Sequence, residues 1–444
     1  MDSINPRDAS IAKARSGGVT TANVMPGSGW LVSGQTFYMR LRDGETIEDI
    51  AWFFPDGSVM GRLKMANGTN PIRETPGFPT TRAKSAALVR AAFAEAKAYC
   101  GGDKKTVDLG KEVLTPRVAT PGFVDARTLV GLAGYLNQFD DQDQLDTGAA
   151  LQPQLRAIDG YNPDETLVDW VRSFGVTTIH TGHGPGTVVS GQTMVAKTRA
   201  KTADAAAIVP RAMIAANLGP NALDSDKGSG TRPKQMALLR GALTAAKSGD
   251  AEAKLGTATK LDAQVWKDVL ARRVPLMVTA NRSQDIMSAL RLKDEFGIDL
   301  VIDGGAESYR LLEQLREAGV TVILHPTMGR HYGDMENASF TTAATLREAG
   351  IPFALQSGYE AYVPKTRVIL WEAGWAAANG LAPEHALASI TIDAARAIGV
   401  GERVGSLSVG KDGDVVLFDG DPLEYTSHVT GVVIDGRVAS REVR

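Results

Sequence analysis

Short apolar runs alternate with amphipathic helices in the second half of this chain, and this alternation limits the fold more than any other feature. The expected strands are residues 274–279, 298–303, 320–325 and 351–356, and the expected helices between them are 283–296, 308–318 and 342–349. Strands that alternate with helices of this length predict βα units and a parallel sheet. We therefore expect an α/β fold built on a TIM-like (β/α)8 barrel, with a doubly wound sheet as the alternative.

Residues 119–132, which read ATPGFVDARTLVGL, predict the first strand of that sheet. A Pro-Gly turn leads into a short apolar run that ends at Asp125, and a loop of small residues follows. A buried parallel strand that carries side chains to one end of a barrel has this form. Residues 175–180 are the expected second strand.

The C-terminal segment has a different pattern. Residues 403–440 read RVGSLSVGKDGDVVLFDGDPLEYTSHVTGVVIDGRVAS, with alternating apolar residues, Gly-Asp turns and no helical periodicity. Alternation of this kind predicts short half-buried strands. We expect a small β unit here, forming a reduced β-sandwich appendage beside the barrel.

Together, PGFVDA at 121–126 and the stretch ALASITIDAARAIGV…GSLSVGKDGD near the C-terminus resemble the amidohydrolase superfamily, in particular its imidazolonepropionase-like branch. The resemblance covers about residues 106–440. It implies an amidohydrolase barrel and a sandwich whose N-terminal half lies upstream of Thr106. It also implies a hydrolase that acts on carbon–nitrogen bonds other than peptide bonds.

The resemblance further implies one or two divalent metals such as zinc, held by His and Asp side chains at the strand ends, which lower the pKa of a bound water. Most of the implied ligand positions carry residues that cannot hold a metal: Arg127, Leu129, Thr279, Gly304 and Gly358. We therefore expect no metal ligands and no cofactor, the ancestral zinc or other divalent ion having been lost.

Other polar residues lie where the strands are expected to end, which is the face where barrel enzymes place working residues. His183 and His325 are candidate acid/base groups, with His180 and Asp303 as further catalytic candidates. The expected ligand-binding residues are Arg127, Glu307 and Tyr359; an arginine suits a carboxylate or a phosphate. In the alternative reading, Arg127 pairs with Asp303 or Glu307 and the histidines are hydrogen-bonded loop residues.

The chain also contains an internal repeat. Residues 5–40 align without gaps on residues 162–197, with 15 identities in 36 positions, and residues 81–97 align on 231–247, with 9 in 17.

We expect three domains: 1–101, a partial amidohydrolase-like α/β fragment that repeats about 158–250; 106–402, the barrel; and 403–444, the C-terminal β unit. The fragment should contain a helix over 81–99, with a linker at 101–105. A partial barrel should expose apolar surface or pair with another chain.

The composition of the chain limits the classes of partner that we expect. A net charge of −3, from 48 basic and 51 acidic residues, gives no electrostatic reason to expect nucleic acid or a membrane as a partner. The only cysteine, Cys100, excludes an intrachain disulfide. The first ten residues lack the apolar region of a signal peptide, which indicates the cytoplasm for the chain as it stands. Because many relatives are exported, the natural compartment stays open.

Two functions fit these observations. The first is an amidohydrolase-related hydrolase of carbon–nitrogen bonds with a degenerate metal site and a rebuilt set of strand-end residues. The second is a non-catalytic homologue that binds a small ligand or supports an active paralogue. The expected partners are accordingly a small-molecule ligand or substrate and, in addition, a second copy of the chain or a paralogous amidohydrolase.

Overall fold

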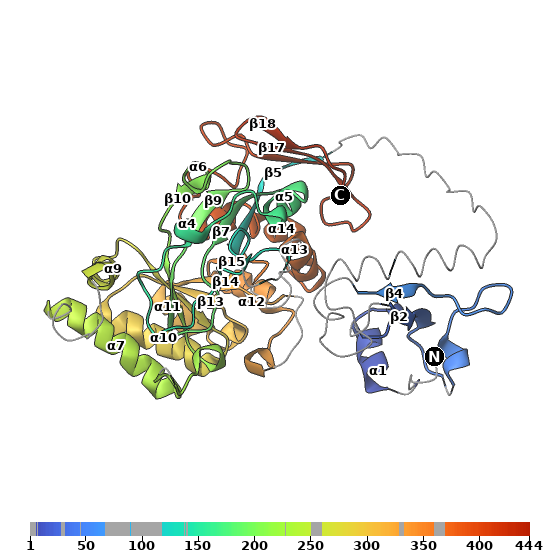
Figure 1. Cartoon of the computed structure of the whole chain (residues 1–444), viewed down its shortest axis with the longest axis horizontal. Helices are drawn as coiled ribbons and strands as arrows, with labels where there is room; N and C mark the ends of the chain where they lie inside the picture. The colour runs from blue at the N-terminus through green and yellow to red at the C-terminus, as the bar shows by residue number, and fades with distance from the viewer. Residues whose placement is uncertain are drawn as a thin grey trace. The chain divides into compact units, whose positions relative to one another are not determined.

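The structure is a computed structural model that describes residues 6, 8–27, 32–44, 46–66, 89, 118–136, 138, 141–226, 228–249, 260–327, 333–358 and 369–444. The chain divides into two compact units, Met1–Lys111 and Glu112–Arg444, called unit 1 and unit 2 below (Figure 1). The expected helix at 81–99, apart from residue 89, and the expected linker at 101–105 lie outside the described residues.

Unit 1 contains short elements around a small apolar core. Its described helices and strands are α1 (Ala9–Ser16), β1 (Thr21–Val24), β2 (Val32–Gln35), β3 (Phe37–Arg40), α2 (Ile47–Ile50) and β4 (Leu63–Met65). β1 pairs antiparallel with β3, and β2 pairs antiparallel with β4. The core consists of Phe37, Met39, Leu41, Ile50 and Ala51.

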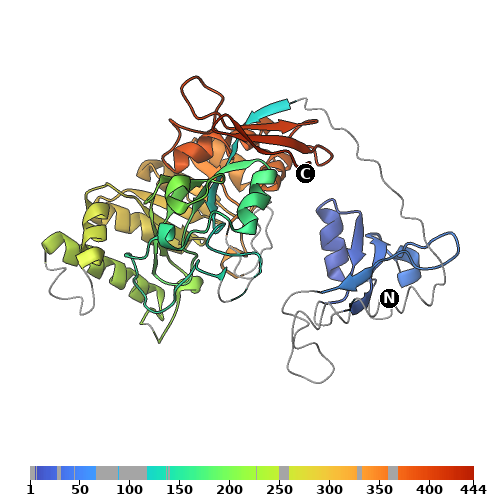
Figure 2. The same ribbon diagram turned by 45° about the horizontal axis from the view of Figure 1, so that its top comes forward.

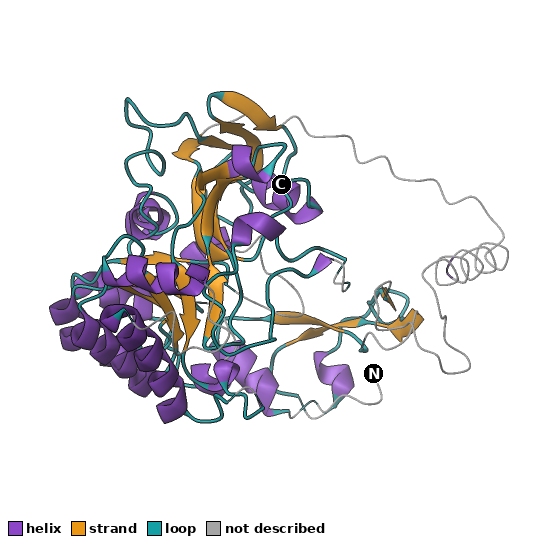
Figure 3. Cartoon of the chain, turned by 60° about the vertical axis from the view of Figure 1, so that its left-hand side comes forward, coloured by secondary structure: helices purple, strands orange, loops and turns teal. Residues whose placement is uncertain are grey.

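Unit 2 is built mainly from strands flanked by helices (Figure 3). Its strands are β5 (Val118–Pro121), β6 (Phe123–Thr128), β7 (Val176–Thr181), β8 (Val189–Gln192), β9 (Met194–Lys197), β10 (Ala207–Val209), β11 (Ile214–Asn217), β12 (Leu276–Ala280), β13 (Leu300–Gly304), β14 (Thr321–Leu324), β15 (Phe353–Leu355), β16 (Val415–Phe418), β17 (Val429–Ile434) and β18 (Arg437–Ser440). Its α-helices are α4 (Ala157–Gly160), α5 (Thr166–Ser173), α6 (Ala203–Ala206), α7 (Arg232–Ser248), α9 (Lys260–Leu270), α10 (Ser283–Phe296), α11 (Leu312–Ala318), α12 (Thr342–Glu348), α13 (Ile369–Ala378), α14 (Pro383–Ala388) and α15 (Ile392–Ala397).

The strands of unit 2 form two sheets that carry the expected βα pattern, with orders β10-β9-β7-β6 and β15-β14-β13-β12-β11-β8. β11 to β15 are all parallel, as are β6 and β7. β8 and β9 follow each other directly and connect the two sheets through their neighbours β11 and β7. β6 and β15 are the outer strands of these two sheets. Gly358 N donates to Arg127 O (3.2 Å), which joins the segment after β15 to β6.

Apolar side chains cover both faces of these strands, as expected for buried parallel strands. One cluster joins the strands to the helices; it includes Ile214, Val278, Ile302, Val322 and Leu355 from the strands, with Leu243 and Ile286 from the helices. The opposite face has a second cluster, whose strand residues are Val124, Ala126, Val195, Ala215, Met277, Val301, Ile323 and Ala354. Residues of α15 pack against this second cluster.

The structure differs from the expected all-parallel arrangement at β8 and β9, which are not parallel to their neighbours. β9 runs antiparallel to β7, and β8 runs antiparallel to β11. The residues between β7 and β9 contain only β8 and no helix, whereas the crossover between two parallel strands is usually a helix.

The third sheet of unit 2 has four antiparallel strands in the order β18-β17-β16-β5 and combines a strand from near the start of the unit with strands from near its end (Figure 2). β5, near the start of the unit, pairs with β16, near its end. We expected the N-terminal part of this appendage upstream of Thr106, but β5 lies downstream of that residue. β5 ends at Pro121 and β6 begins at Phe123, so only Gly122 separates the two strands. The strand of the appendage therefore directly precedes the first parallel strand.

A buried lysine ties this sheet to the rest of unit 2. Lys197, at the end of β9, lies 2.6 Å from Asp414, 3.1 Å from Asp412 and 3.3 Å from Asp435. The side chains of Lys197 and Asp414 are almost completely buried. This cluster joins residues that lie 217 positions apart in the sequence.

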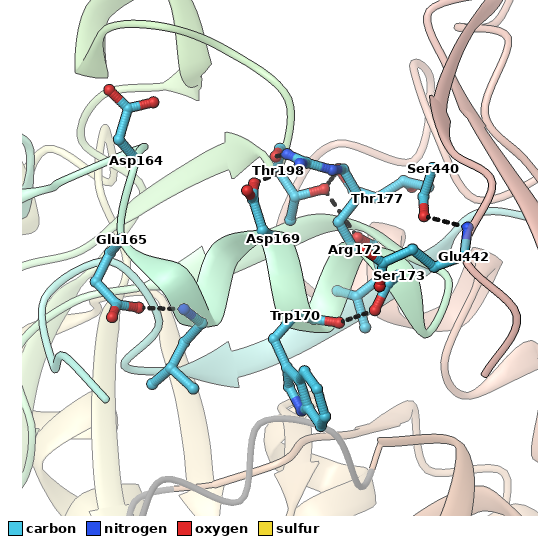
Figure 4. Close-up of polar contacts among 12 residues, drawn as sticks. Asp164, Glu165, Asp169, Trp170, Arg172, Ser173, Thr177, Thr198, Ser440 and Glu442 are labelled. Atoms are coloured by element: carbon cyan, nitrogen blue, oxygen red, sulfur yellow. Dashed lines mark hydrogen bonds and ion pairs between the residues drawn. The ribbon is translucent and has the colours of Figure 1, made fainter. Parts of the chain in front are cut away.

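Helix α5 shows how side chains fix an element locally (Figure 4). Glu165 precedes the helix and accepts a hydrogen bond from Leu167 N (2.5 Å), which satisfies one free N–H group of the first turn. In the last turn, Arg172 donates to the Thr198 carbonyl (2.6 Å) and pairs with Asp169. These contacts fix the helix against the segment that follows β9. Among the described residues, no helix is both long and apolar enough to cross a membrane.

Candidate functional site

A ring of polar residues lies at the carboxyl ends of the parallel strands, on the face that carries the second apolar cluster. Each member stands two positions after an apolar residue of that cluster, so it points to the same side of its strand. We call this set the polar rim, and its members are Asn217, Thr279, Asp303, His325 and Gln356. The sequence places Asp303 and His325 here as candidates, and the structure brings them to this same edge.

Asp303 lies at the centre of a hydrogen-bond network in the polar rim. Its Oδ2 accepts from the Thr279 hydroxyl (2.6 Å), and its Oδ1 accepts from Gln356 Nε2 (2.6 Å). Thr279 lies directly beside Asp303 in the register of β12 and β13. The carboxylate is therefore held by neutral donors on both sides, and it is buried.

Arg127 is buried at the end of β6 with only 3% of its surface exposed. Its guanidinium donates to the His183 carbonyl and to the Thr128 carbonyl (3.2 Å). Burial lowers the pKa of Arg127, and the charges of Asp303 and Asp125 oppose that change. Among the described side chains no ion pair joins Arg127 to Asp303 or Glu307, so the expected direct pairing is replaced by bonds to carbonyl groups.

His180 is fully buried on β7, and both of its ring nitrogens are used. Nδ1 lies 2.8 Å from the Ala126 carbonyl, which can only accept, so this nitrogen carries the proton. Nε2 then accepts from the Thr193 hydroxyl (2.6 Å). Burial and the nearby Arg127 charge lower the pKa of His180 to about 3. The ring is neutral and has no lone pair left for a metal or a substrate.

His183 lies in the loop after β7 and is also buried. Burial, followed by the charge of Arg127, lowers its pKa to about 4, and the Leu155 carbonyl opposes this change. Neither ring nitrogen has a hydrogen-bond partner of normal geometry in the described part of the chain. His183 is therefore neutral near pH 7, with ring nitrogens that could still accept a partner.

The remaining candidates occupy different positions. His325 is half-buried, and its buried Nδ1 has no hydrogen-bond partner among the described residues. Glu307 accepts from Ser283 N and Oγ (2.8 Å each) and from Asn337 Nδ2 (2.8 Å). Burial favours a higher pKa for Glu307, but these hydrogen bonds outweigh it and the pKa is lowered. Glu307 thus binds the first residue of α10. Tyr359 lies outside the described residues.

Sequence reasoning missed Asp125, which is buried at 1% exposure. Burial raises its pKa to about 7; hydrogen bonds from Ser357 N (3.0 Å) and Arg127 N (3.3 Å) oppose this rise, while the charge of Glu372 adds to it. The PGFVDA pattern marks the position of Asp125, but only the fold shows that its carboxyl group joins β6 to the segment after β15.

The comparisons with known proteins place this arrangement in a family. Residues 361–439 match the family model described as "Amidohydrolase family". An imidazolonepropionase of Shouchella clausii is 36% identical over 109 residues, which are 24% of this chain and 24% of that protein. One from Shewanella sp. is 34% identical over 142 residues, 30% of this chain and 34% of that protein. The chain thus matches about a quarter to a third of the length of these curated relatives.

An amidohydrolase from Thermotoga maritima has a solved structure with a TM-score of 0.70 to this chain. The two are 27% identical, and the likeness covers 77% of this chain and 92% of that one. The chain belongs to the amidohydrolase superfamily. The curated relatives place this amidohydrolase homologue in the imidazolonepropionase-like branch. The likeness implies the amidohydrolase fold, which is a TIM barrel with an accompanying sheet.

In this amidohydrolase homologue, side chains that are not metal ligands stand at several positions where the family resemblance implies a divalent metal. The buried guanidinium of Arg127 stands at the first ligand position, where a second cation would be repelled. A Cβ atom on Gly304 would lie 2.5 Å from Asn281 Oδ1, and one on Gly358 would lie 2.6 Å from His325 Cε1 and Nε2. Other side chains therefore fill the space at two further ligand positions. No group of three His, Cys, Asp or Glu in the described ranges could hold a metal ion.

The contact between Gly358 and His325 gives a testable prediction. Gly358 has φ +81° and lies against the His325 ring, whereas Gly350 has φ +68° and open space around it. We expect Gly350→Ala to cost about 1–2 kcal/mol of unfolding free energy, which is the cost of the left-handed backbone alone. Gly358→Ala should cost clearly more, because His325 must also move. Urea unfolding of both variants measures the difference, and equal losses would show that His325 does not occupy this space.

Proposed function

We propose that this chain descends from metal-dependent hydrolases of carbon–nitrogen bonds other than peptide bonds, and that it binds a small carboxylate-bearing ligand without a metal. The observation that carries this proposal is the buried guanidinium of Arg127 at the first metal-ligand position. An arginine presents several N–H donors in a plane that matches a carboxylate. Two carbonyl groups accept from this guanidinium, and they do not neutralise its charge.

We also propose that the strands of unit 2 close into an eight-stranded barrel, with β8 and β9 together as the third strand. The bonds from Gly358 N to Arg127 O and from Ser357 N to Asp125 Oδ1 support closure between β15 and β6. Closure would put Arg127 beside the polar rim. The unpartnered Nδ1 of His325 and Oδ1 of Asn281 would then serve as further polar contacts for a ligand.

A second candidate is hydrolysis without a metal. Family membership supports hydrolysis, although relatives use a metal for it. His183, His325 and Asp303 would be the acid/base groups. The low pKa of His183, about 4, makes it a weak base at neutral pH, and hydrogen bonds hold both oxygens of Asp303. These contacts support ligand binding more than catalysis. The fully bonded ring of His180 fits a structural role.

Thermal unfolding with small dicarboxylates, succinate and glutarate, tests the proposal. At ten times its Kd, a ligand that binds only the folded state stabilises it by about 1.4 kcal/mol. We expect the same rise in Tm in EDTA and in added zinc, and none in the Arg127→Met variant. Arg127→Lys should keep part of the effect because it keeps the charge.

Arg310→Met is the matched control, since Arg310 is an exposed arginine whose loss should leave the response intact. A ligand effect that requires zinc, or one that persists in Arg127→Met, would contradict the proposal. Zinc-dependent hydrolysis of a cyclic amide would favour ordinary amidohydrolase chemistry instead.

A further inference from the structure

Most elements of unit 1 recur in unit 2 at a spacing of 157 residues. Helix α1 and strands β2 and β3 have the same bounds as α5, β8 and β9 when 157 is added to their residue numbers, and β1 corresponds to the last four residues of β7. Helix α2 corresponds to α6 at a spacing of 156. The order of elements along the chain is also the same.

The pairing of the strands is repeated as well. The register of β1 with β3, for example Asn23 opposite Tyr38, is the register of β7 with β9, where His180 lies opposite Val195. β2 pairs antiparallel with β4, as β8 pairs antiparallel with β11. In both pairs the register shifts at the same place, between Val32 and Gly34 in β2 and between Val189 and Gly191 in β8.

The helix caps agree too. Asp8 accepts from Ser10 N (2.8 Å) before α1, as Glu165 accepts from Leu167 N before α5. Each pair consists of residues 157 positions apart. Unit 1 is therefore built like the segment of unit 2 that runs from α5 to β11.

In unit 2 that segment has two further neighbours, which unit 1 lacks in its described part. The outer edge of β7 pairs in parallel with β6, and the outer edge of β11 pairs in parallel with β12. The corresponding strands β1 and β4 each have one partner only, β3 and β2, among the described residues. A strand edge without a partner presents N–H and C=O groups that can pair with another chain.

Apolar side chains are exposed in unit 1 where their counterparts in unit 2 are covered. Val19 is 44% exposed and its counterpart Val176 is 1% exposed. Val32 is 41% exposed and Leu63 is 55% exposed, whereas their counterparts Val189 and Ile214 are fully buried. In unit 2 the residue opposite Val176 is Phe123 of β6. Val19 thus lies where β6 covers its counterpart in unit 2, and no described strand of unit 1 pairs at that position.

We propose that unit 1 binds an apolar, extended segment of another polypeptide as a parallel strand along β1, in the position that β6 has along β7. Strand addition of this kind uses main-chain hydrogen bonds for affinity and side-chain contacts for selectivity. The register of β6 on β7 identifies the segment. A large apolar residue such as phenylalanine lies opposite Val19, and a β-branched residue follows it.

We take the occupant to be a separate polypeptide, because β6 of the same chain already pairs with β7 and no other described strand pairs with this edge of β1. No lysine or proline protects β1, which reads TANV, and this leaves its edge open to pairing.

Fluorescence anisotropy with the full-length chain tests this proposal. The probe is a labelled peptide with the sequence of residues 121–130, PGFVDARTLV. We expect saturable binding that Val19→Lys weakens at least about tenfold. A peptide that carries Phe123→Lys should bind equally weakly to the wild-type chain. Val409→Lys, at a fully exposed valine of unit 2, should leave binding unchanged and is the matched control.

Binding that Val19→Lys does not change would overturn the proposal, since the peptide would then be bound elsewhere. Sedimentation of the wild-type chain gives a second, independent result. A dimer that Val19→Lys dissociates, together with no peptide binding, would identify a second copy of the chain as the occupant and would also overturn the proposal. Because Val19 is already exposed, this substitution should leave the unfolding free energy within about 0.5 kcal/mol of wild type.

Discussion

The Lys197→Met variant is expected to lose about 3–5 kcal/mol of unfolding free energy. Lys197 pairs with all three aspartates of the cluster that joins β9 to the C-terminal sheet, whereas Arg403 contacts Asp412 alone. Methionine fills a similar volume but leaves the buried Asp414 carboxylate without a counter-charge, and the two other aspartates repel it. Urea unfolding, followed by circular dichroism, measures the loss.

Two further variants separate the lost charge from lost packing. Arg240→Met removes one partner of the exposed Arg240–Glu295 pair and should cost less than about 1 kcal/mol. The double variant Lys197→Met/Asp414→Asn should recover part of the loss, because it removes the buried carboxylate as well. If Lys197→Met costs no more than Arg240→Met, the cluster does not hold the sheet in place.

Asp125→Asn should make the chain more stable at pH 8, with a gain that disappears towards acid pH. The folded state raises the pKa of Asp125 to about 7 from an ordinary value of 3.8. Below pH 3.8 the carboxyl is protonated in both states and costs nothing. As the pH rises towards 7, the unfolded chain releases the proton first, so stability falls; above pH 7 the loss is complete and constant. The whole difference corresponds to about 4 kcal/mol at most.

The measurement is the difference in unfolding free energy between Asp125→Asn and wild type at a series of pH values. We expect this difference to grow from pH 4 to pH 7 and then to level off. Asparagine can still accept from Ser357 N, so the contact between β6 and the segment after β15 is retained. Asp56→Asn, at an exposed aspartate whose hydrogen bonds to Ser58 lower its pKa, is the control. A difference independent of pH would show that Asp125 is ionised in the folded state.

The sequence predicts the parallel strands of unit 2 well, because apolar runs between amphipathic helices specify buried strands directly. The expected strands at 298–303 and 351–356 correspond to β13 and β15, with ends that differ by a few residues. The antiparallel direction of β8 and β9 could not be predicted in this way. The sequence of β8 and β9, VSGQTMVAK, specifies an extended chain but not the direction in which each strand runs beside its neighbour.

The site was predictable in position but not in detail. The sequence places Arg127, His180 and Asp303 at strand ends, and the structure puts them there. It could not show that His180 bonds to Ala126 and Thr193, or that Arg127 donates to carbonyl groups. These contacts join segments that only tertiary folding brings together. Nor could it show that Asn281 and His325 fill the space at Gly304 and Gly358, since that depends on packing across neighbouring strands.

The pairing of β5 with β16 also has a consequence for how the protein is made. β5 is among the first parts of unit 2 to leave the ribosome, and β16 is among the last. Until the segment from Asp412 to Asp435 has been synthesised, β5 lacks its strand partner β16 and Lys197 lacks its aspartates. Unit 2 therefore completes its fold only when the C-terminal strands emerge from the exit tunnel, and a nascent chain that stalls shortly before Asp414 lacks the fold of this sheet.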